Sequence, residues 1–371
     1  MIYVQLKYII RKVENAMGTA ALSDVDIFSV NDNFQKYKKI KSELRYGRRL
    51  KNIKLSIMIP AYKRTTYLKR AIDSVLQQKT NYSFEVVVVD NTVENDAIFD
   101  IVGQYRDERV AYYKNETNIG MFGNWNRCIE LAGADYFCIL SDDDMLKHDF
   151  VEKILNKLAT LDSCAAISAN FEFVDEMDRV VLPTDNSGMF YQMNSFFRWY
   201  KDFQVCVTGS VISKKAAMDI GGFSEELYPG SDVAFMVKLN YLTKQCYHYF
   251  VCLAQYRVAS NESINATTQV RGIRFVNWFV NSLARYLCLD GNFHKLHRRV
   301  RCLEQERLYQ EWFSGKADDF KDLNLELGLC ELNDYENQNY RRYCDFYMQR
   351  VAINNLGELA YVGDLIIANK E

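Results

Sequence analysis

The length, composition and charge of the chain exclude several classes of protein. Of its 371 residues, 49% are hydrophobic, 14% aromatic and 25% charged, which is typical of a folded globular protein and not of a disordered one. Forty-six Lys and Arg against 48 Asp and Glu leave a formal net charge of −2, which gives no electrostatic reason to expect a nucleic-acid partner.

The ten cysteines form no Cys-x-x-Cys pair and lie mostly in apolar runs, where reduced cysteines behave as small hydrophobic residues. This pattern predicts a reducing, cytoplasmic location. No run approaches the ~18 uncharged apolar residues that a membrane-spanning helix needs.

Residues 1–53 are rich in Lys, Arg and scattered aromatics toward their end, and we interpret them as a helical and basic N-terminal extension. An abrupt apolar run, 54–60, then predicts a buried strand. Strands and helices alternate from there, with strands at 54–60, 84–90, 110–114 and 136–140 and helices near 65–79, 95–106, 121–132 and 148–160. Alternation with nearly continuous Val and Ile runs predicts an α/β fold whose mainly parallel sheet carries helices on both faces.

The next segment is mixed in pattern. We predict strands at 164–174, 180–182, 205–212 and 248–258, and helices near 214–220 and 231–243. From about residue 270 the chain is polar and helical and lacks strand signals, so it is predicted to form a helical appendage.

Ligands of open α/β sheets bind beyond the carboxyl ends of the strands. The residues that follow the predicted strands are 60–64, 90–91, 118–120 and 141–144. No Gly-x-Gly-x-x-Gly follows the first strand and no Gly-x-x-x-x-Gly-Lys-Ser/Thr occurs, which argues against dinucleotide oxidoreductases and P-loop enzymes.

Three consecutive aspartates, Asp142, Asp143 and Asp144, follow the strand 136–140. Adjacent anions repel one another, and a hard cation such as Mg²⁺ or Mn²⁺ relieves that repulsion while leaving positions for phosphate oxygens. In an extended segment Asp142 and Asp144 would point the same way, so we assign these two to the metal and Asp143 to an uncertain third contact. The alternative is that one aspartate caps the helix near residue 148.

Four motifs in this order resemble the family 2 glycosyltransferases of the GT-A fold, over roughly residues 54–260. They are the strand and turn 56–64, the strand 86–91, the segment 118–132 that leads to the aspartates, and the pair Gly221–Leu227 and Gly230–Asp232. Each motif alone is weak, whereas four at family-like separations are specific. The resemblance implies a single displacement with inversion, in which a sugar moves from a nucleotide-diphosphate sugar, with UDP-sugars favoured, to a hydroxyl of a glycan or lipid-linked glycan.

The resemblance also implies roles for residues of the first half. Asp90 would accept hydrogen bonds from a uracil-type base or from ribose, and Pro60, Ala61 and Tyr62 would shape the base pocket. Arg64 would meet phosphate. The alternatives are a turn-forming aspartate, a strand-terminating turn and a solvated arginine.

Asn118, Gly120 and Asn126 would let the backbone approach the nucleoside, although structural roles explain them at least as well. Asp142 and Asp143 complete the predicted nucleotide site.

Asp232 is the candidate general base, and its alternative is a helix cap. The chain departs from the family pattern at Ser231, where an acid is common, and at Ala259, where many members carry a metal-binding His.

With the resemblance, the chain divides into the extension 1–53, a GT-A domain 54–265 and the helical region 266–371. The domain splits into a nucleotide-binding half, 54–145, and an acceptor half, 146–265. Apolar residues at Phe275, Phe279, Leu283 and Leu287 predict an amphipathic helix, which either packs on the catalytic domain or makes peripheral membrane contact. A non-catalytic sugar-nucleotide-binding relative and a sugar nucleotidyltransferase remain alternative functions.

Overall fold

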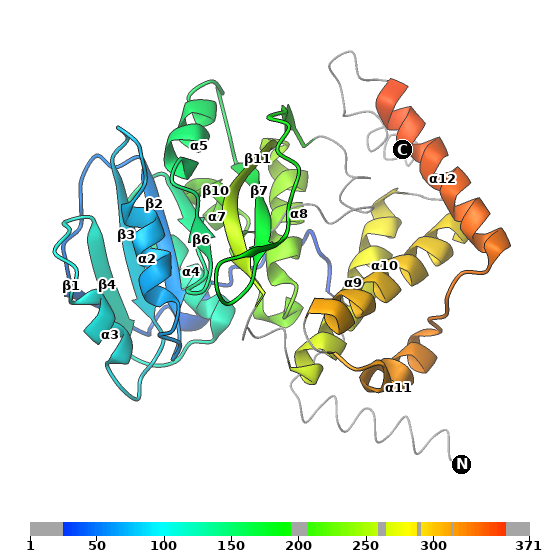
Figure 1. Ribbon diagram of the computed structural model, residues 1–371, viewed down its shortest axis with the longest axis horizontal. Coiled ribbons are helices and arrows are strands. Elements are labelled where there is room, and N and C mark those ends of the chain that lie inside the picture. The colour runs from blue at the N-terminus through cyan, green and yellow to red at the C-terminus, as the bar shows by residue number, and fades with distance from the viewer. Residues whose placement is uncertain (1–24, 194–206, 259–264, 288–290, 313–314, 354–371) are drawn as a thin grey trace.

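The computed structural model describes residues 25–193, 207–258, 265–287, 291–312 and 315–353. An eleven-stranded mixed sheet forms its centre, and helices lie on both faces and at the C-terminal side (Figure 1). The expected α/β class, with a parallel sheet core, is confirmed.

The strands are β1 Ser42–Tyr46, β2 Leu55–Ala61, β3 Phe84–Asp90, β4 Val110–Asn115, β5 Tyr136–Ile139, β6 Met145–Leu146, β7 Ala166–Val174, β8 Val180–Leu182, β9 Phe190–Gln192, β10 Ser210–Ser213 and β11 Cys246–Arg257. Eight of these eleven described strands correspond to predicted ones, and β1, β6 and β9 were not predicted.

The helices also lie within the predicted segments. They are α2 Leu68–Leu76, α3 Ala97–Val102, α4 Met121–Leu131, α5 Phe150–Leu158, α7 Lys214–Asp219, α8 Ser231–Thr243, α9 Ala266–Leu287, α10 Gly291–Trp312, α11 Ala317–Leu327 and α12 Asp334–Ile353, with short 3-10 helices η2 Gln35–Tyr37 and η3 Glu225–Leu227.

The sheet order is β1-β4-β3-β2-β5-β10-β7-β11-β6, with β8 beside β7 and β9 beside β11. Neighbours among β4, β3, β2 and β5 are parallel, and so are β7 and β11. β10 is antiparallel to both β5 and β7, which makes β5, β7 and β11 run the same way. Their carboxyl ends therefore lie at one edge of the sheet.

Alternating side chains of the parallel strands fill two separate cores. In β3, Val86 and Val88 pack on the side of α2, α3 and α5, while Val87 and Val89 pack on the side of α4, α7 and α8. Because all four are fully buried, the strand reads as a continuous apolar run, as expected for a sheet covered on both faces.

The expectation of a helical N-terminal extension is wrong for its described part. Residues 42–46 form β1, an edge strand antiparallel to β4, and between 25 and 53 the helical structure that is described amounts to the single turn η2. β1 is largely exposed and charged, as edge strands often are, so it lacks the apolar alternation by which a strand is predicted. Residues 1–24 lie outside the described residues.

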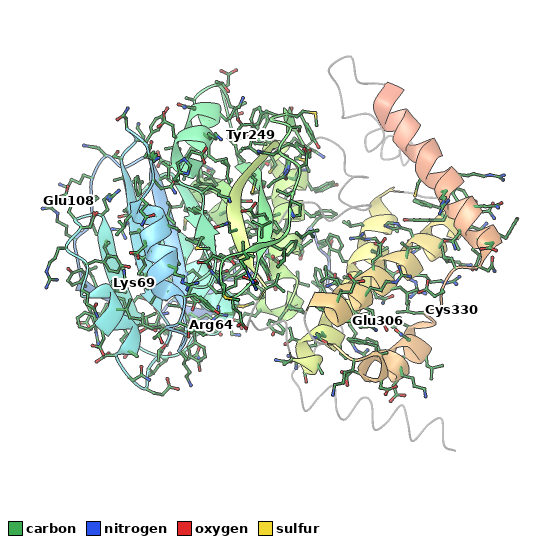
Figure 2. All side chains as sticks on the ribbon, in the orientation of Figure 1. Arg64, Lys69, Glu108, Tyr249, Glu306 and Cys330 are labelled. Carbon is green, nitrogen blue, oxygen red and sulfur yellow. The ribbon has the colours of Figure 1, made fainter. Side chains whose placement is uncertain are left out.

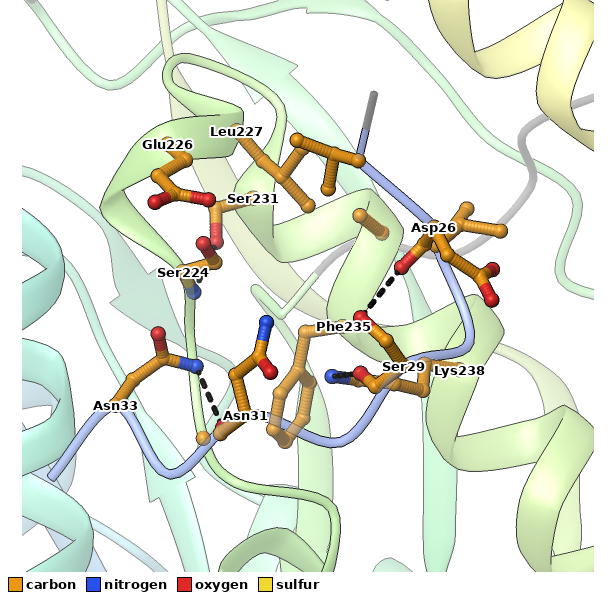
Figure 3. Close-up of a pocket in the computed structure, with 14 residues that line it drawn as sticks. Asp26, Ser29, Asn31, Asn33, Ser224, Glu226, Leu227, Ser231, Phe235 and Lys238 are labelled. Carbon is orange, nitrogen blue, oxygen red and sulfur yellow. Dashed lines mark hydrogen bonds between the residues drawn. The ribbon is translucent and has the colours of Figure 1, made fainter. Parts of the chain in front are cut away.

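The segment 25–40 packs against the loop before α8 and against α8 itself (Figure 3). Phe28 is buried with its ring centroid 4.0 Å from that of Tyr241 in α8. The amide of Asn33 donates to the carbonyl of Gly221 at 3.0 Å, and the Nη2 of Arg127 donates to the carbonyl of Ile40 at 2.9 Å. Part of the predicted extension is thus integral to the main core.

The amphipathic stripe of α9 packs inward. Phe275, Phe279 and Leu283 are buried and belong to the same core as α4 and α8; the side chain of Leu287 lies outside the described residues. Several basic residues of the following helix form ion pairs within the C-terminal region, including Arg299 with Glu336. Packing on the domain, one of the two alternatives, accounts for the stripe, and none of the described helices is long and apolar enough to cross a membrane.

Phe275 docks the C-terminal helices onto the loop that precedes α8. A Cβ atom added to Gly230 would lie 2.1 Å from the Cε1 of Phe275, so the ring occupies the space that a side chain there would take. The contact places α9 directly against the segment that leads to Asp232.

We expect Phe275→Ala to destabilise the protein by about 3–5 kcal/mol, because it leaves a cavity between α9 and α8. Equilibrium unfolding in urea measures this loss. Leu325→Ala is the matched control, since Leu325 is 76% exposed on α11 and its truncation should change stability by less than about 0.5 kcal/mol. Equal effects of the two substitutions would contradict the described docking of α9.

Candidate active site

The three aspartates form a tight turn at the carboxyl end of β5. The amide of Asp144 donates to the carbonyl of Ser141 at 3.1 Å, which closes the turn around Asp142 and Asp143. All three aspartates are buried, with 4%, 9% and 2% of Asp142, Asp143 and Asp144 exposed. We call residues 141–144 the aspartate turn.

Arg64 reaches the aspartate turn from the loop after β2 (Figure 2). Its Nη1 donates to the Oδ2 of Asp143 at 2.7 Å, and its Nη2 donates to the Oδ1 of Asp142. One guanidinium therefore bridges two adjacent carboxylates, and the strand order β2-β5 explains why the two loops meet.

Asp144 points away from the other two carboxylates. Its Oδ1 accepts the amide of Arg257 at 2.9 Å, and its Oδ2 accepts the hydroxyl of Thr208 at 3.2 Å. The expectation that Asp142 and Asp144 point the same way is wrong, because residues 141–144 form a turn and not an extended segment. Asp142 and Asp143, and not Asp144, share the guanidinium of Arg64.

Arg257, the last residue of β11, donates hydrogen bonds to the aspartate turn from its backbone and its side chain. Its side chain is fully buried, and its Nε donates to the carbonyl of Asp143 at 2.9 Å. Its Nη1 and Nη2 donate to the carbonyl of Asp175 and to the carboxylate of Asp178, while its guanidinium carbon lies 4.2 Å from the centroid of the Tyr67 ring. Arg257 is not among the site residues that the sequence predicts.

Burial raises the pKa values of two carboxyl groups in the aspartate turn. Burial, reinforced by the charge of Asp143, raises the pKa of Asp142 to about 7, although the Arg64 guanidinium opposes the shift. Burial and the charge of Asp143 also raise the pKa of Asp144 well above its usual range. Carboxyl groups with such raised pKa values at a strand end are typical of functional sites.

Asp90 ends β3 and is fully buried. Its Oδ1 accepts the amide of Thr92 and its Oδ2 accepts the hydroxyl of Tyr112, both at 2.7 Å. Burial raises its pKa, while the Tyr112 hydroxyl opposes the shift. These contacts fit the turn-forming alternative, and contact with a nucleotide stays a prediction.

Pro60 and Ala61 are the last residues of β2 and pair with Val89 and Asp90 of β3. Tyr62 follows them and is 40% exposed, with the Lys63 ammonium 5.0 Å from its ring centroid. A base pocket at these residues stays a prediction.

Asn118 and Gly120 join a network of amides beside the end of β3. The Nδ2 of Asn91 donates to the Oδ1 of Asn118 at 2.6 Å and to the carbonyl of Gly120 at 3.1 Å. Gly120 has φ 76° and precedes α4, a conformation that favours glycine. Both residues are exposed at the loop, so they are accessible to a ligand.

Asn126 lies away from this loop and is buried. Its Nδ2 donates to the carbonyl of Phe223 at 2.9 Å, and its Oδ1 accepts the Phe223 amide at 2.8 Å. Asn126 thus holds the Gly221–Leu227 motif against α4, which is the structural role left open as its alternative.

Asp232 lies in the first turn of α8. α8 leads directly into β11, whose last residue, Arg257, contacts the aspartate turn. Burial raises the pKa of Asp232 to about 6, while the amides of Asp232 and Val233 oppose the shift. The N-cap residue of α8 is Gly230, and the Asp232 carboxylate faces the first-turn amides of Asp232 and Val233, so the helix-end role stays open beside the predicted role as general base.

Of the two residues that depart from the family pattern, Ser231 and Ala259, the structure describes Ser231. Ser231 is buried, and its hydroxyl accepts the amide of Ser224 at 2.9 Å in the small pocket of Figure 3. This serine therefore has a structural partner. Ala259 lies outside the described residues.

The donor chemistry around Arg64 suits a hard divalent cation, since Asp142 and Asp143 already surround a positive group with carboxylate oxygens. Among the residues that the structure describes, no three His, Cys, Asp or Glu side chains are arranged to hold a metal. Any cation here would need further ligands from elsewhere, such as phosphate oxygens and water.

Comparison with known proteins gives a consistent result. Residues 56–221 match the family description "Glycosyl transferase family 2". The chain is 26% identical over 140 residues to the glycosyltransferase GlyA of Streptococcus pneumoniae serotype 4, which covers 37% of this chain and 18% of GlyA. It is 28% identical over 116 residues to the amylovoran biosynthesis glycosyltransferase AmsB of Erwinia amylovora, with 30% and 38% covered.

Among solved structures, S. aureus TarS in complex with UDP-GlcNAc matches with a TM-score of 0.52 at 16% identity, covering 85% of this chain and 89% of that one. TarS in complex with UDP matches with a TM-score of 0.51. This likeness shows that the fold is shared. The chain spans between 18% and 59% of the length of the first three curated relatives that it matches.

We expect Arg257→Met to destabilise the protein by about 1–3 kcal/mol, because the Asp143 carbonyl loses its buried donor, whereas Asp178 keeps its ion pair with Arg70. Urea unfolding measures the effect. Arg179→Met is the control from the β7–β8 hairpin that Arg257 contacts, since Arg179 pairs with Asp175 but is 69% exposed, and its loss should cost less than about 1 kcal/mol. An Arg257→Met protein as stable as the control would refute the supporting role.

Proposed function

Since this chain belongs to glycosyltransferase family 2, we propose that it transfers a sugar from a nucleotide-diphosphate sugar, preferably a UDP-sugar, to a hydroxyl of a glycan or lipid-linked glycan. The observation that carries the proposal is the aspartate turn. Two buried carboxylates and a guanidinium meet there at the carboxyl edge of the sheet, where α/β folds bind their ligands.

In this proposal the donor lies across the ends of β2, β3 and β5. Tyr62 stacks on the base, and the backbone near Asn118 and Gly120 approaches the nucleoside. Asp90 contributes to this pocket, directly or by fixing the turn through Thr92. The diphosphate lies over Arg64 and the aspartate turn.

Asp142 and Asp143 would hold Mn²⁺ or Mg²⁺, which when bound neutralises charge on the departing diphosphate. The original assignment of Asp144 to the metal requires its carboxylate to leave Arg257 and Thr208, so we propose Asp143 as the second ligand. Arg64 adds hydrogen bonds to the same phosphate oxygens.

Asp232 acts as the general base. It accepts the proton of the acceptor hydroxyl as that oxygen forms a bond to the anomeric carbon. The bond from this carbon to the phosphate oxygen breaks at the same time, the electron pair leaves with the nucleoside diphosphate, and the configuration inverts. A pKa of about 6 keeps Asp232 ionised, and hence basic, at neutral pH.

The acceptor side is built by the start of α8 and by α9, and AmsB and TarS give only a general indication of the substrate class. We propose a surface-polysaccharide acceptor such as a lipopolysaccharide or O-antigen precursor. For a lipid-linked acceptor, we propose that the C-terminal helices contact the membrane surface.

A non-catalytic nucleotide-sugar-binding relative is the second candidate. The observation that favours it is Ser231, which stands where an acid is common and is bonded to Ser224. Binding without turnover would identify this function.

We expect one nucleoside diphosphate from a panel of UDP, GDP, CDP and dTDP to raise the melting temperature only when Mn²⁺ is present. At 100 times its Kd, a ligand stabilises by about 2.7 kcal/mol. Differential scanning fluorimetry measures the shift. Asp142→Ala/Asp143→Ala should lose it, whereas Asp219→Ala, an exposed aspartate of α7, should keep it. No shift in folded wild-type protein would contradict donor binding.

We expect Asp232→Asn to lower kcat by about 10²–10⁴-fold while it keeps the nucleotide-induced thermal shift, because the variant loses only the proton acceptor. Release of nucleoside diphosphate from the donor measures turnover. The wild-type kcat/KM should fall as the pH drops below about 6, since protonation removes the base.

Asp219→Asn is the control, and its turnover should match the wild type. Full activity in Asp232→Asn would remove Asp232 from the mechanism, and absence of turnover in the wild type with a bound donor would support the non-catalytic alternative.

A further inference from the structure

Arg64 occupies the position at which a cation would neutralise the aspartate turn. Its two terminal nitrogens contact one oxygen each of Asp142 and Asp143, so the guanidinium spans the pair as a bridging metal ion would. Among ion pairs between described residues, those with Arg64 are the ones that involve these carboxylates.

The backbone around Arg64 is fixed, whereas its side chain can move. The Arg64 amide donates to the carbonyl of Tyr62 at 2.7 Å, and the Lys63 amide donates to the Thr92 hydroxyl at 2.7 Å. The Arg64 side chain nevertheless remains 44% exposed, while Asp142 and Asp143 are buried beneath it. The guanidinium is therefore accessible from solvent, whereas its carboxylate partners are not.

A divalent cation and the guanidinium compete for the same oxygens. A cation that bound Asp142 and Asp143 beside Arg64 would meet its positive charge within a few ångströms at a buried site, where like charges repel strongly. The carboxylate of Asp144 is engaged elsewhere, since its two oxygens accept hydrogen bonds from Arg257 and Thr208.

We propose that Arg64 is a positioning residue that occupies the cation site while the donor site is empty, and that a diphosphate draws its guanidinium away. The guanidinium matches the geometry of phosphate oxygens and forms paired hydrogen bonds with them. The carboxylates then become available to the divalent cation, so cation and diphosphate enter together. This inference rests on the proposed function.

The coupling has a measurable consequence. Because linkage is reciprocal, the factor by which UDP tightens Mn²⁺ binding equals the factor by which Mn²⁺ tightens UDP binding. Arg64 suppresses binding of the cation alone, and therefore it enlarges this factor.

Titration of the wild-type chain with Mn²⁺, followed by the electron paramagnetic resonance signal of the free ion, tests the inference directly. We expect Arg64→Ala to bind Mn²⁺ without nucleotide at least tenfold more tightly than the wild type. UDP, or the diphosphate that stabilises the protein most, should tighten Mn²⁺ binding at least tenfold more in the wild type than in the variant.

Lys63→Ala is the matched control for charge. It removes one positive charge from the same loop, but Lys63 pairs with Glu94 and does not contact the aspartate turn, so its Mn²⁺ affinity should match the wild type. Arg64→Gln, which preserves the length of the side chain without the charge, should follow Arg64→Ala and gives the same test if the alanine variant folds poorly. Asp142→Asn/Asp143→Asn in the Arg64→Ala background should abolish the gain.

Equal Mn²⁺ affinity of the wild type and both Arg64 variants would overturn the inference, as would a gain that survives loss of Asp142 and Asp143 or one reproduced by Lys63→Ala. Failure of every diphosphate to bind the wild type with Mn²⁺ would instead contradict the proposed function. The comparison of Mn²⁺ binding without nucleotide would still decide the role of Arg64.

Discussion

Burial of adjacent aspartates at the end of β5 is the constraint on which the rest of the site depends. Asp142, Asp143 and Asp144 repel one another, and a buried carboxylate is costly unless it is paired or hydrogen-bonded. Arg64 supplies charge to the first two, and the Arg257 backbone supplies a donor to the third. The turn can therefore exist only where the loop after β2 and the end of β11 converge.

This convergence links both halves of the sheet. β2 is the direct parallel neighbour of β5, whereas β11 reaches the same edge through β10 and β7. Arg257 then ties the turn to the β7–β8 hairpin through Asp178. One buried guanidinium thus joins the aspartate turn to the β7–β8 hairpin, and α9 adds a further layer by packing Phe275 against the loop before Asp232.

Arg64 and Arg257 differ in burial, which suits them to different roles. Arg257 is fully buried with every direction of its guanidinium engaged, so it is suited to fixed support. Arg64 contacts carboxylates through a half-exposed side chain, so it is suited to exchange between protein and ligand oxygens. The same chemical group serves as scaffold or as mobile counterion according to its burial.

The sequence by itself determined the α/β class, most element positions and the place of the aspartates, because apolar runs such as 84–90 and motif order are local properties. It missed β1, whose edge pairing needs no apolar face. Only the tertiary structure decided that Asp142 and Asp143 share the guanidinium of Arg64, that Asn126 binds Phe223, and that Arg257 donates to the aspartate turn. Side-chain direction in a turn and contacts between residues 78 to 114 positions apart depend on the packing of distant strands, which no local pattern records.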